Sequence, residues 1–265
     1  MRKPLGFTLV LALDAARLRS FEQSWPTWRQ HRPEVIALNW IVIADAHQGT
    51  PDQWRRRLDR LDLPSYRLVC WGWPQSDEDD DGGSAPGLSA GPHPIEHPIL
   101  QSERIATALL RVPAACCDTS HWILIDPAAR AAKPPAPKKL WLDPRWFPRS
   151  GAPALVGQTQ SPALLPPDVP AIQTWANRHE DTLLRRMPPL DPLDRYAIPA
   201  PWLLVVESGF GKLAAQLANH NRLRATPLHL YLWYLARRLE LPARMERFDR
   251  VGWMPPEQPE HEATP

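Results

Sequence analysis

The sequence predicts one α/β domain built on a mainly parallel central sheet. Three continuous apolar runs, 7–13, 38–44 and 121–126, are typical of strands covered on both faces. Helical patterns alternate with these runs along the chain. Because a crossover connection within one sheet joins parallel strands and is nearly always right-handed, this alternation favours a parallel sheet flanked by helices.

The individual elements follow from apolar runs and from residues that start or stop helices. The predicted strands are 7–13, 38–44, 66–71, 121–126, 154–157 and 202–206. The predicted helices are 15–28, 53–61, 99–112, 173–187, 210–219 and 227–239. Pro26 is expected to break the first helix, since proline has no N–H to donate. Thr50 and Pro51 mark the start of the second helix, as its cap and its first-turn residue.

Three segments are predicted to lack regular structure. Residues 75–98 combine an acidic run with Gly, Ser and Pro, which indicates a mobile surface loop. The acidic run lacks the spaced ligands and closing carboxylate of a calcium loop. Residues 127–139 form a loop rich in Ala, Pro and Lys, and 254–265 form a disordered tail. We therefore expect one domain over residues 1–253.

The charge balance and the cysteines exclude several classes of protein. The chain has 31 Lys and Arg against 29 Asp and Glu, a net charge of +2, and the charges are mixed along it. Nucleic-acid binding is not predicted, and the triplet 55–57 of arginines is better explained as a solvated helix face. Three cysteines without paired spacing favour neither a disulfide framework nor a zinc site.

The apolar runs are too short to cross a bilayer, and no signal-peptide pattern follows the first of them. A cytoplasmic protein without a transmembrane segment is expected. The oligomeric state is not predicted.

Three predicted strands end in aspartates, Asp14, Asp45 and Asp126. Ligands of open parallel sheets gather in the crevice at the carboxyl ends of the strands. Carboxylates there can accept hydrogen bonds from a base or a ribose, or hold a divalent metal against a diphosphate. The alternative for each aspartate alone is that it caps the helix that follows. The three together favour a binding site.

Residues 8–13, 25–28, 40–45 and 49–52, taken in this order, resemble the opening of the GT-A-type glycosyltransferases, which use nucleotide-diphospho-sugar donors. Residues 121–126 are similar to the strand that leads into the family's Asp-x-Asp metal motif. Residues 141–147, the strand near 155 and residues 226–234 resemble a bacterial branch of the superfamily. The resemblance covers roughly residues 5 to 253.

The resemblance implies a GT-A-like, Rossmann-like fold and the transfer of a sugar from a nucleotide-sugar donor to an acceptor that it does not identify. Asp45 corresponds to the aspartate that contacts the nucleotide base, and Asp14 lies beside it as a further donor-binding candidate. Asp126 would approach the diphosphate or a Mn²⁺ or Mg²⁺ ion.

Two departures from the family pattern weaken the metal site. Ala128 stands where the Asp-x-Asp motif has its second acid, and a lone carboxylate at Asp126 holds Mg²⁺ or Mn²⁺ poorly. Where the bacterial branch is expected to carry an aspartate, the chain has His229. A histidine can act as a general base near neutral pH, although one at a helix start is more often structural.

Four further residues are candidates for roles at this site. Glu207, at a strand end, is the first candidate for the base that activates the acceptor, with a helix cap as the alternative. Lys133 is a candidate for cradling the diphosphate where a metal is missing, and Arg130 for stabilising charge in the transition state. Trp141 can stack against a sugar or base, or pack in the core.

Other functions remain as alternatives. A catalytically inactive relative that binds a nucleotide or a protein partner is consistent with Ala128. A nucleotidyltransferase would need a Gly-rich basic loop after the first strand, which Asp14–Arg17 does not supply. No G-x-G-x-x-G pattern follows any predicted strand, which argues against a Rossmann-type dehydrogenase.

Overall fold

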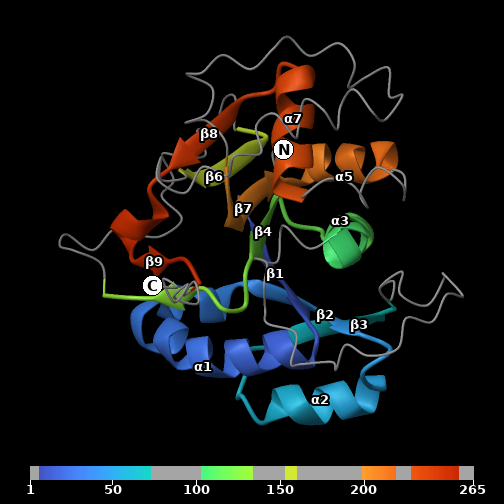
Figure 1. Cartoon of the computed structure of the whole chain (residues 1–265), viewed down its shortest axis with the longest axis vertical. Coiled ribbons are helices and arrows are strands. Elements are labelled where there is room, and N and C mark those ends of the chain that lie inside the picture. Colours follow the sequence, from blue (N-terminus) through green and yellow to red (C-terminus); the bar gives the residue numbers. More distant parts are fainter. Residues whose placement is uncertain (1–5, 73–102, 134–152, 160–198, 219–227, 257–265) are drawn as a thin grey trace, which may run out of the picture.

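The computed structural model describes residues 6–72, 103–133, 153–159, 199–218 and 228–256. Seven strands form the central sheet, in the spatial order β3-β2-β1-β4-β7-β6-β8 (Figure 1). Their bounds are β1 Phe7–Leu13, β2 Asn39–Asp45, β3 Tyr66–Trp71, β4 His121–Ile125, β6 Leu155–Thr159, β7 Pro199–Glu207 and β8 Ala243–Glu246. A separate two-stranded sheet pairs β5, Arg130–Ala131, with β9, Trp253–Met254.

The helices connect and cover these strands. Their bounds are α1 Ala15–His31, α2 Pro51–Asp59, α3 Glu103–Cys116, α5 Ser208–Leu217 and α7 Leu228–Arg238, with 3₁₀ helices η1 Pro33–Ala37 and η7 Phe248–Val251. Asp14 caps α1, and its carboxylate accepts a hydrogen bond from the Arg17 N–H. Thr50 and Gln53 form a reciprocal capping box at α2, with Pro51 in the first turn.

The predicted mainly parallel sheet is confirmed. All neighbouring pairs among β3, β2, β1 and β4 are parallel, and β7 runs opposite to β4 and to β6. Since β6 and β8 are parallel to each other, β7 is the single reversed strand of the seven. The edge at which β1 to β4 end is called the carboxyl edge below, and the opposite edge the amino edge.

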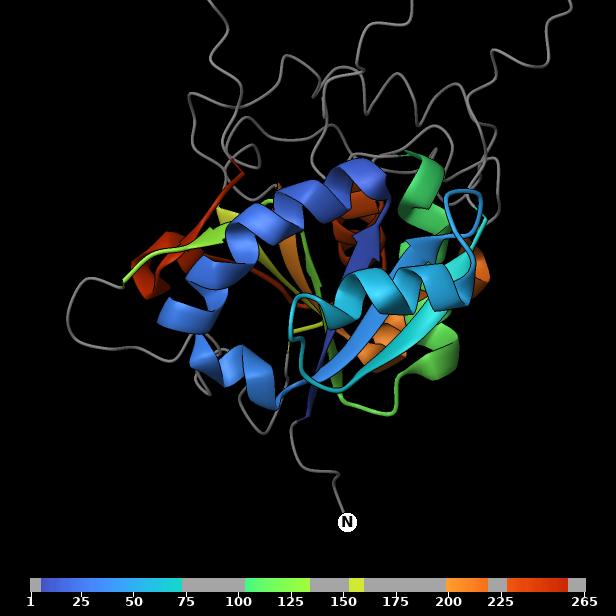
Figure 2. The ribbon, with the colours of Figure 1, turned by 90° about the horizontal axis from the view of Figure 1, so that it is seen from below.

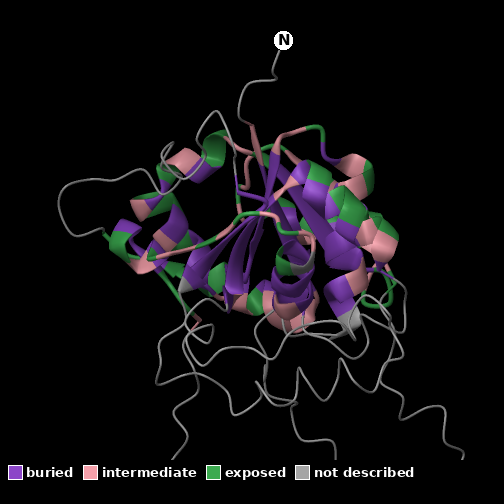
Figure 3. Ribbon diagram, turned by 90° about the horizontal axis from the view of Figure 1, so that it is seen from above, coloured by how far each residue is buried: buried purple, intermediate pink, exposed green. Residues whose placement is uncertain are grey.

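Alternate residues of the strands point to two separate apolar layers, as expected for a sheet covered on both faces. Leu9, Leu11 and Leu13 of β1 belong to the layer beneath α1 and α2, whereas Val10 and Ala12 belong to the layer beneath α3, α5 and α7. Figure 2 shows α1 and α2 crossing the same side of the sheet, and Figure 3 shows buried strands at the centre of the molecule.

Tryptophans fill the layer beneath α1 and α2. Trp25 lies edge-on to Trp40, with ring centroids 5.4 Å apart, and Trp28 lies edge-on to Trp253 at 5.0 Å. Each of three indoles also donates to a backbone carbonyl: Trp25 to Leu61, Trp28 to Ala129 and Trp40 to Val35. Because the indole N–H is satisfied in each case, these large side chains are buried without a polar penalty.

The structure corrects three local predictions. Helix α1 continues through Pro26 to His31, because Trp25 and Trp28 on either side of the proline are both buried in one layer and hold the two halves together. The expected loop 127–139 contains β5, and the expected tail from 254 begins with the last residue of β9, Met254. The predicted loop 75–98, the predicted helix 173–187 and residues 257–265 lie outside the described residues.

Close packing of α5 on β4 yields a first prediction. A side chain at Gly211 would overlap the six-membered ring of Trp122, whose side chain is fully buried. We expect Gly211→Ala to lower the free energy of unfolding by about 1–3 kcal/mol, since a packed core resists added volume. Chemical denaturation measures this. Gly6→Ala is the control, because its added methyl would meet Thr119 Cγ2 at an ordinary 3.4 Å. Equal stability of the two variants would contradict the packing described here.

Candidate functional site

The three strand-ending aspartates lie at one edge of the sheet. Leu13 pairs with Ala44, so Asp14 and Asp45 are the next residues on adjacent strands. Val10 pairs with Leu124, which sets Asp126 just beyond the end of β4 on the other side of β1. The expected convergence of Asp14, Asp45 and Asp126 from separate segments is therefore present in the fold.

These aspartates flank a topological switch point. The chain passes from β1 outward to β2 and β3, and then returns through α3 to β4 on the opposite side of β1. Open α/β sheets commonly bind ligands at the carboxyl ends of their strands, beside such a switch point. In this fold the connections that leave β1 and β4, helix α1 and the segment after Asp126, pack on the same face of the sheet. Asp14 and Asp126 stand at the two sides of this point.

Asp45 is buried, and only one of its two carboxylate oxygens accepts a hydrogen bond from the described residues. The residue is 3% exposed, and its Oδ1 accepts a hydrogen bond of 3.0 Å from the His47 N–H. Its own carbonyl accepts from the Trp54 indole at 2.9 Å, which fixes the backbone at the strand end. Its second carboxylate oxygen accepts no hydrogen bond from the described residues, so it can accept from a ligand.

Asp14 serves as a helix cap, the alternative that the sequence left open. Besides capping α1, its carboxylate forms an ion pair with Arg17. The first N–H of the helix, that of Ala15, donates to Gln48 Oε1 at 2.7 Å. Gln48 thereby ties the loop after Asp45 to the start of α1. We infer that Asp14 shapes this edge, whereas Asp45 has an oxygen to offer a ligand.

Asp126 begins a tight turn. Its Oδ1 accepts from the Ala128 N–H at 2.8 Å, and its carbonyl accepts from the Ala129 N–H at 3.0 Å. Asp at the first position and Pro127 at the second are typical of such a turn. The Asp126 N–H donates to the Trp202 carbonyl on β7, and the residue is 6% exposed. One carboxylate oxygen is thus committed to the backbone.

The donor set at Asp126 does not fit a Mn²⁺ or Mg²⁺ ion held by the protein alone. These ions take several hard oxygen ligands in a defined geometry. Within the described part of the chain, no cluster of three His, Cys, Asp or Glu side chains is arranged to hold a metal. Ala128, two residues after Asp126, has no side chain that can bind a metal, and its N–H donates to one oxygen of Asp126.

The prediction that Glu207 lies on the active face is wrong. Because β7 is the reversed strand, its last residue pairs with His121 at the start of β4, on the amino edge. The Glu207 carboxylate accepts from the Phe210 N–H at 2.7 Å and caps α5. Asp126 lies at the other end of the same strand pair, so Glu207 does not reach a ligand at the carboxyl edge.

The remaining candidates occupy different environments. His229 lies in the first turn of α7 and is 4% exposed. Lys133 and Arg130 follow Asp126, and both residues are exposed. Trp141 lies outside the described residues.

The three cysteines are free, and burial raises the pKa of the Cys117 thiol to about 11, consistent with a packing residue.

Sequence reasoning missed the contribution of the loop after Asp45. Gln48 and His47 carry no motif, and the bond from Ala15 to Gln48 joins positions 33 residues apart. The His47 ring lies over Gly72, where an added Cβ would be 3.0 Å from Nε2. These contacts depend on the register of β1, β2 and β3, which no short sequence pattern encodes.

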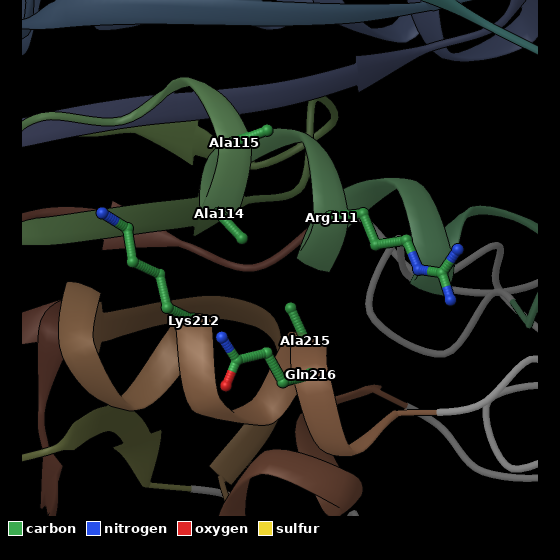
Figure 4. A pocket seen from close by; sticks show the side chains of 6 residues that line it. All are labelled: Arg111, Ala114, Ala115, Lys212, Ala215 and Gln216. Atoms are coloured by element: carbon green, nitrogen blue, oxygen red, sulfur yellow. The ribbon is translucent and has the colours of Figure 1, made fainter.

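A shallow hollow of about 360 Å³ lies on another part of the molecule, between α3 and α5. It is lined by Arg111, Ala114, Ala115, Lys212, Ala215 and Gln216. Figure 4 shows the Arg111 and Lys212 side chains extending toward opposite ends of this hollow. Their charges do not converge on one point, and none of the predicted site residues lines the hollow.

Comparison with known proteins gives structural neighbours only. No protein-family model and no curated protein sequence matches the chain. The chain is similar to the galactosyltransferase LgtC in complex with donor and acceptor sugar analogs, with a TM-score of 0.49, 10% identity, and 90% of this chain and 72% of that chain covered.

Two mannosyltransferases are also similar. For PcManGT from Pyrobaculum calidifontis, in complex with GDP-Man and Mn²⁺, the TM-score is 0.46 at 12% identity, over 97% of this chain and 58% of that one. This chain therefore spans less than two thirds of that enzyme. For Ktr4p from S. cerevisiae the TM-score is 0.46 at 10% identity, over 94% and 70%.

The neighbours are GT-A-type glycosyltransferases, the class indicated by the sequence resemblance. At these values no activity follows from the similarity. A separate finding concerns membranes: among the described residues no helix has the length and apolarity needed to cross one.

The position of Glu207 yields a second prediction. We expect Glu207→Ala to lower the free energy of unfolding by about 1 kcal/mol, because the Phe210 N–H loses its capping acceptor. Thermal or chemical denaturation measures this change. Glu22→Ala, at an exposed position of α1, serves as the control and should change stability little. A Glu207→Ala variant as stable as the wild type would argue against the capping role.

Proposed function

We propose that this protein binds a nucleotide-diphospho-sugar at the carboxyl edge of its sheet and transfers the sugar to an acceptor that is yet to be identified. The observation that carries the proposal is the convergence of Asp45 and Asp126 on the two sides of β1, at the switch point of the sheet. The GT-A resemblance of the segments that contain them supports the same assignment.

The nucleoside is assigned to the end of β2. A buried carboxylate with one unused oxygen suits the N–H of a base or the hydroxyls of a ribose, because a charged acceptor strengthens such hydrogen bonds. The turn at Asp45 and the bond from Trp54 hold this oxygen in place before a ligand arrives. Such preorganisation reduces the entropy lost on binding.

The diphosphate is assigned to the segment after Asp126. Its negative charge grows as the bond between the sugar and the diphosphate breaks, so cations nearby stabilise the transition state. Arg130 and Lys133 are the cations that this segment exposes. A protein-held Mn²⁺ or Mg²⁺ ion does not fit the residues that the structure describes, so we assign this role to the two side chains.

In the proposed reaction the acceptor hydroxyl attacks the anomeric carbon of the sugar and a new C–O bond forms. The bond from that carbon to the diphosphate oxygen breaks, and the nucleoside diphosphate leaves with the bonding electron pair. A general base takes the proton of the acceptor hydroxyl. With Glu207 on the amino edge, His229 is the remaining candidate for this base.

A second candidate function is a catalytically inactive GT-A-like module that binds a nucleotide or a protein. The observation that favours it is the turn at Asp126, where Ala128 replaces an acid and uses one carboxylate oxygen for its own N–H. A module that binds a nucleotide would share the Asp45 site with the transferase and differ from it in turnover. Incubation with UDP- and GDP-sugars, with water as the acceptor, separates the two, since only a transferase hydrolyses the donor and releases the nucleoside diphosphate.

The shared step yields a third prediction. We expect UDP or GDP to bind, and Asp45→Asn to weaken binding by about tenfold or more, the size of a lost charge-assisted hydrogen bond. Asparagine keeps the acceptor for the His47 N–H, so the turn survives. Isothermal titration calorimetry with and without Mn²⁺ measures both the affinity for the nucleotide and its metal dependence. We expect Mn²⁺ to change this affinity less than about twofold, since the set of metal ligands at Asp126 is incomplete among the described residues.

Asp52→Asn is the matched control, because Asp52 is an exposed acid on α2 whose Arg55 partner is a loose 3.9 Å away. It should bind as the wild type does. Binding of neither nucleotide by the wild-type protein, or equal binding by Asp45→Asn and the wild type, would overturn the proposal.

A further inference from the structure

One stripe of α1 makes hydrogen bonds to the segment that follows Asp126. Three side chains of the stripe donate to backbone carbonyls of the segment and one accepts from a backbone N–H. The bonds are Ser24 Oγ to Pro127 O at 2.5 Å, Trp28 Nε1 to Ala129 O at 2.6 Å, Ala131 N to Thr27 Oγ1 at 3.0 Å, and Arg32 Nη2 to Ala132 O at 3.3 Å.

Ser24, Thr27 and Trp28 lie on one face of α1, because they are separated by three and four residues. Arg32 is the C-cap residue just beyond the end of α1, and its side chain extends the same row of contacts. Ser24, Trp28 and Arg32 are 2%, 0% and 3% exposed. A serine and an arginine buried at the margin of a tryptophan layer are costly unless they are hydrogen-bonded. Ser24 donates to the Phe21 carbonyl as well as to that of Pro127, and Arg32 to the His31 carbonyl as well as to that of Ala132.

The segment is also held from its other side. Its strand β5 pairs with β9, and the Ala132 N–H donates to the Gly252 carbonyl at 2.7 Å. Gly252 has a φ of +88°, and any side chain there would collide with the Arg32 guanidinium and the Ala132 carbonyl. Residues 127–132 are therefore clamped between α1 and β9.

This clamp fixes which side chains of the segment face solvent. Ala129 and Ala131 are buried beneath α1, whereas Arg130 between them is exposed, and Lys133 follows the last clamped residue. The bonds to the backbone therefore determine where two cations stand relative to Asp126. A short segment without a core of its own would not hold this arrangement alone.

We infer that Ser24, Thr27, Trp28 and Arg32 are positioning residues, which hold the segment after Asp126 in the conformation that receives the diphosphate of the donor. This inference rests on the proposed function, and it separates two parts of the ligand. Affinity for the diphosphate would depend on the four residues of the α1 stripe, and affinity for the nucleoside would depend on Asp45.

The test compares two substitutions in the stripe with one elsewhere on the same helix. Ser24→Ala removes the donor to Pro127, and Thr27→Val removes the acceptor for Ala131 at nearly constant volume. Ser20→Ala is the matched control, because its hydroxyl bonds only within α1, to the Ala16 carbonyl at 3.4 Å. Calorimetry measures the Kd of UDP and GDP, and of uridine and guanosine, for each folded variant.

We expect the two stripe variants to bind the nucleoside diphosphate about fivefold more weakly, in line with the loss of one ordinary hydrogen bond. Nucleoside affinity and the control should stay as in the wild type. Amide exchange at residues 128–132 should accelerate in the stripe variants. Thr27→Ser keeps the hydroxyl and should restore diphosphate binding, which a general loss of stability would not explain.

Unchanged diphosphate affinity in variants with faster exchange at 128–132 would overturn the inference while leaving the proposed function in place. An equal loss of nucleoside and diphosphate affinity would also overturn it, since the effect would then be on the whole fold. If the wild-type protein binds neither nucleoside diphosphate, the proposed function fails first and the inference fails with it.

Discussion

The register of β1 against its two parallel neighbours is the constraint on which the rest of the site depends. Pairing of Leu13 with Ala44 and of Val10 with Leu124 brings three acids to one edge, although the first and the last are more than a hundred residues apart in sequence. A shift by one residue would exchange the two apolar faces of β1, so the packing of Leu9 and Leu11 beneath α1 enforces this register. The same burial that stabilises the fold therefore also places the candidate site.

Helix α1 connects the core to this edge. Its tryptophans fill the apolar layer, and its polar stripe bonds the segment after Asp126. Trp28 belongs to both sets, because its ring packs against Trp253 while its indole N–H reaches the Ala129 carbonyl. A change in the packing of α1 would therefore move the backbone that carries Arg130 and Lys133. Stability and site geometry are coupled through this helix. A substitution in α1 can therefore change ligand binding through the packing of the core as well as through the lost side chain.

Much of the fold could be predicted because its strands are long apolar runs covered on both faces; β1 and β3 have the predicted bounds. The direction of β7 could not, since an apolar run has the same composition in either direction, and this is why Glu207 was assigned to the wrong edge. The two-residue strands β5 and β9 are too short to give a period, and their pairing depends on tertiary contacts. The positions of Asp45 and Asp126 at the carboxyl edge were predicted. The turns in which a backbone N–H donates to one carboxylate oxygen of each were not, because they follow from the local backbone geometry.

The charges at this edge bear on how the proposed diphosphate would be accepted there. Two buried carboxylates would repel it, and this repulsion is strong where water is excluded. Asp14 adds little to the repulsion, because Arg17 neutralises it, and each of the other two acids has one oxygen turned toward a backbone N–H. Under the proposed function, Arg130 and Lys133 on the clamped segment are the cations assigned to oppose the remaining negative charge, and both are exposed. A fixed segment would lose less conformational entropy on binding an anion than a flexible one would. The clamp on residues 127–132 is therefore the feature that would make an acidic edge compatible with the proposed diphosphate, since the described residues hold no cluster arranged for a metal.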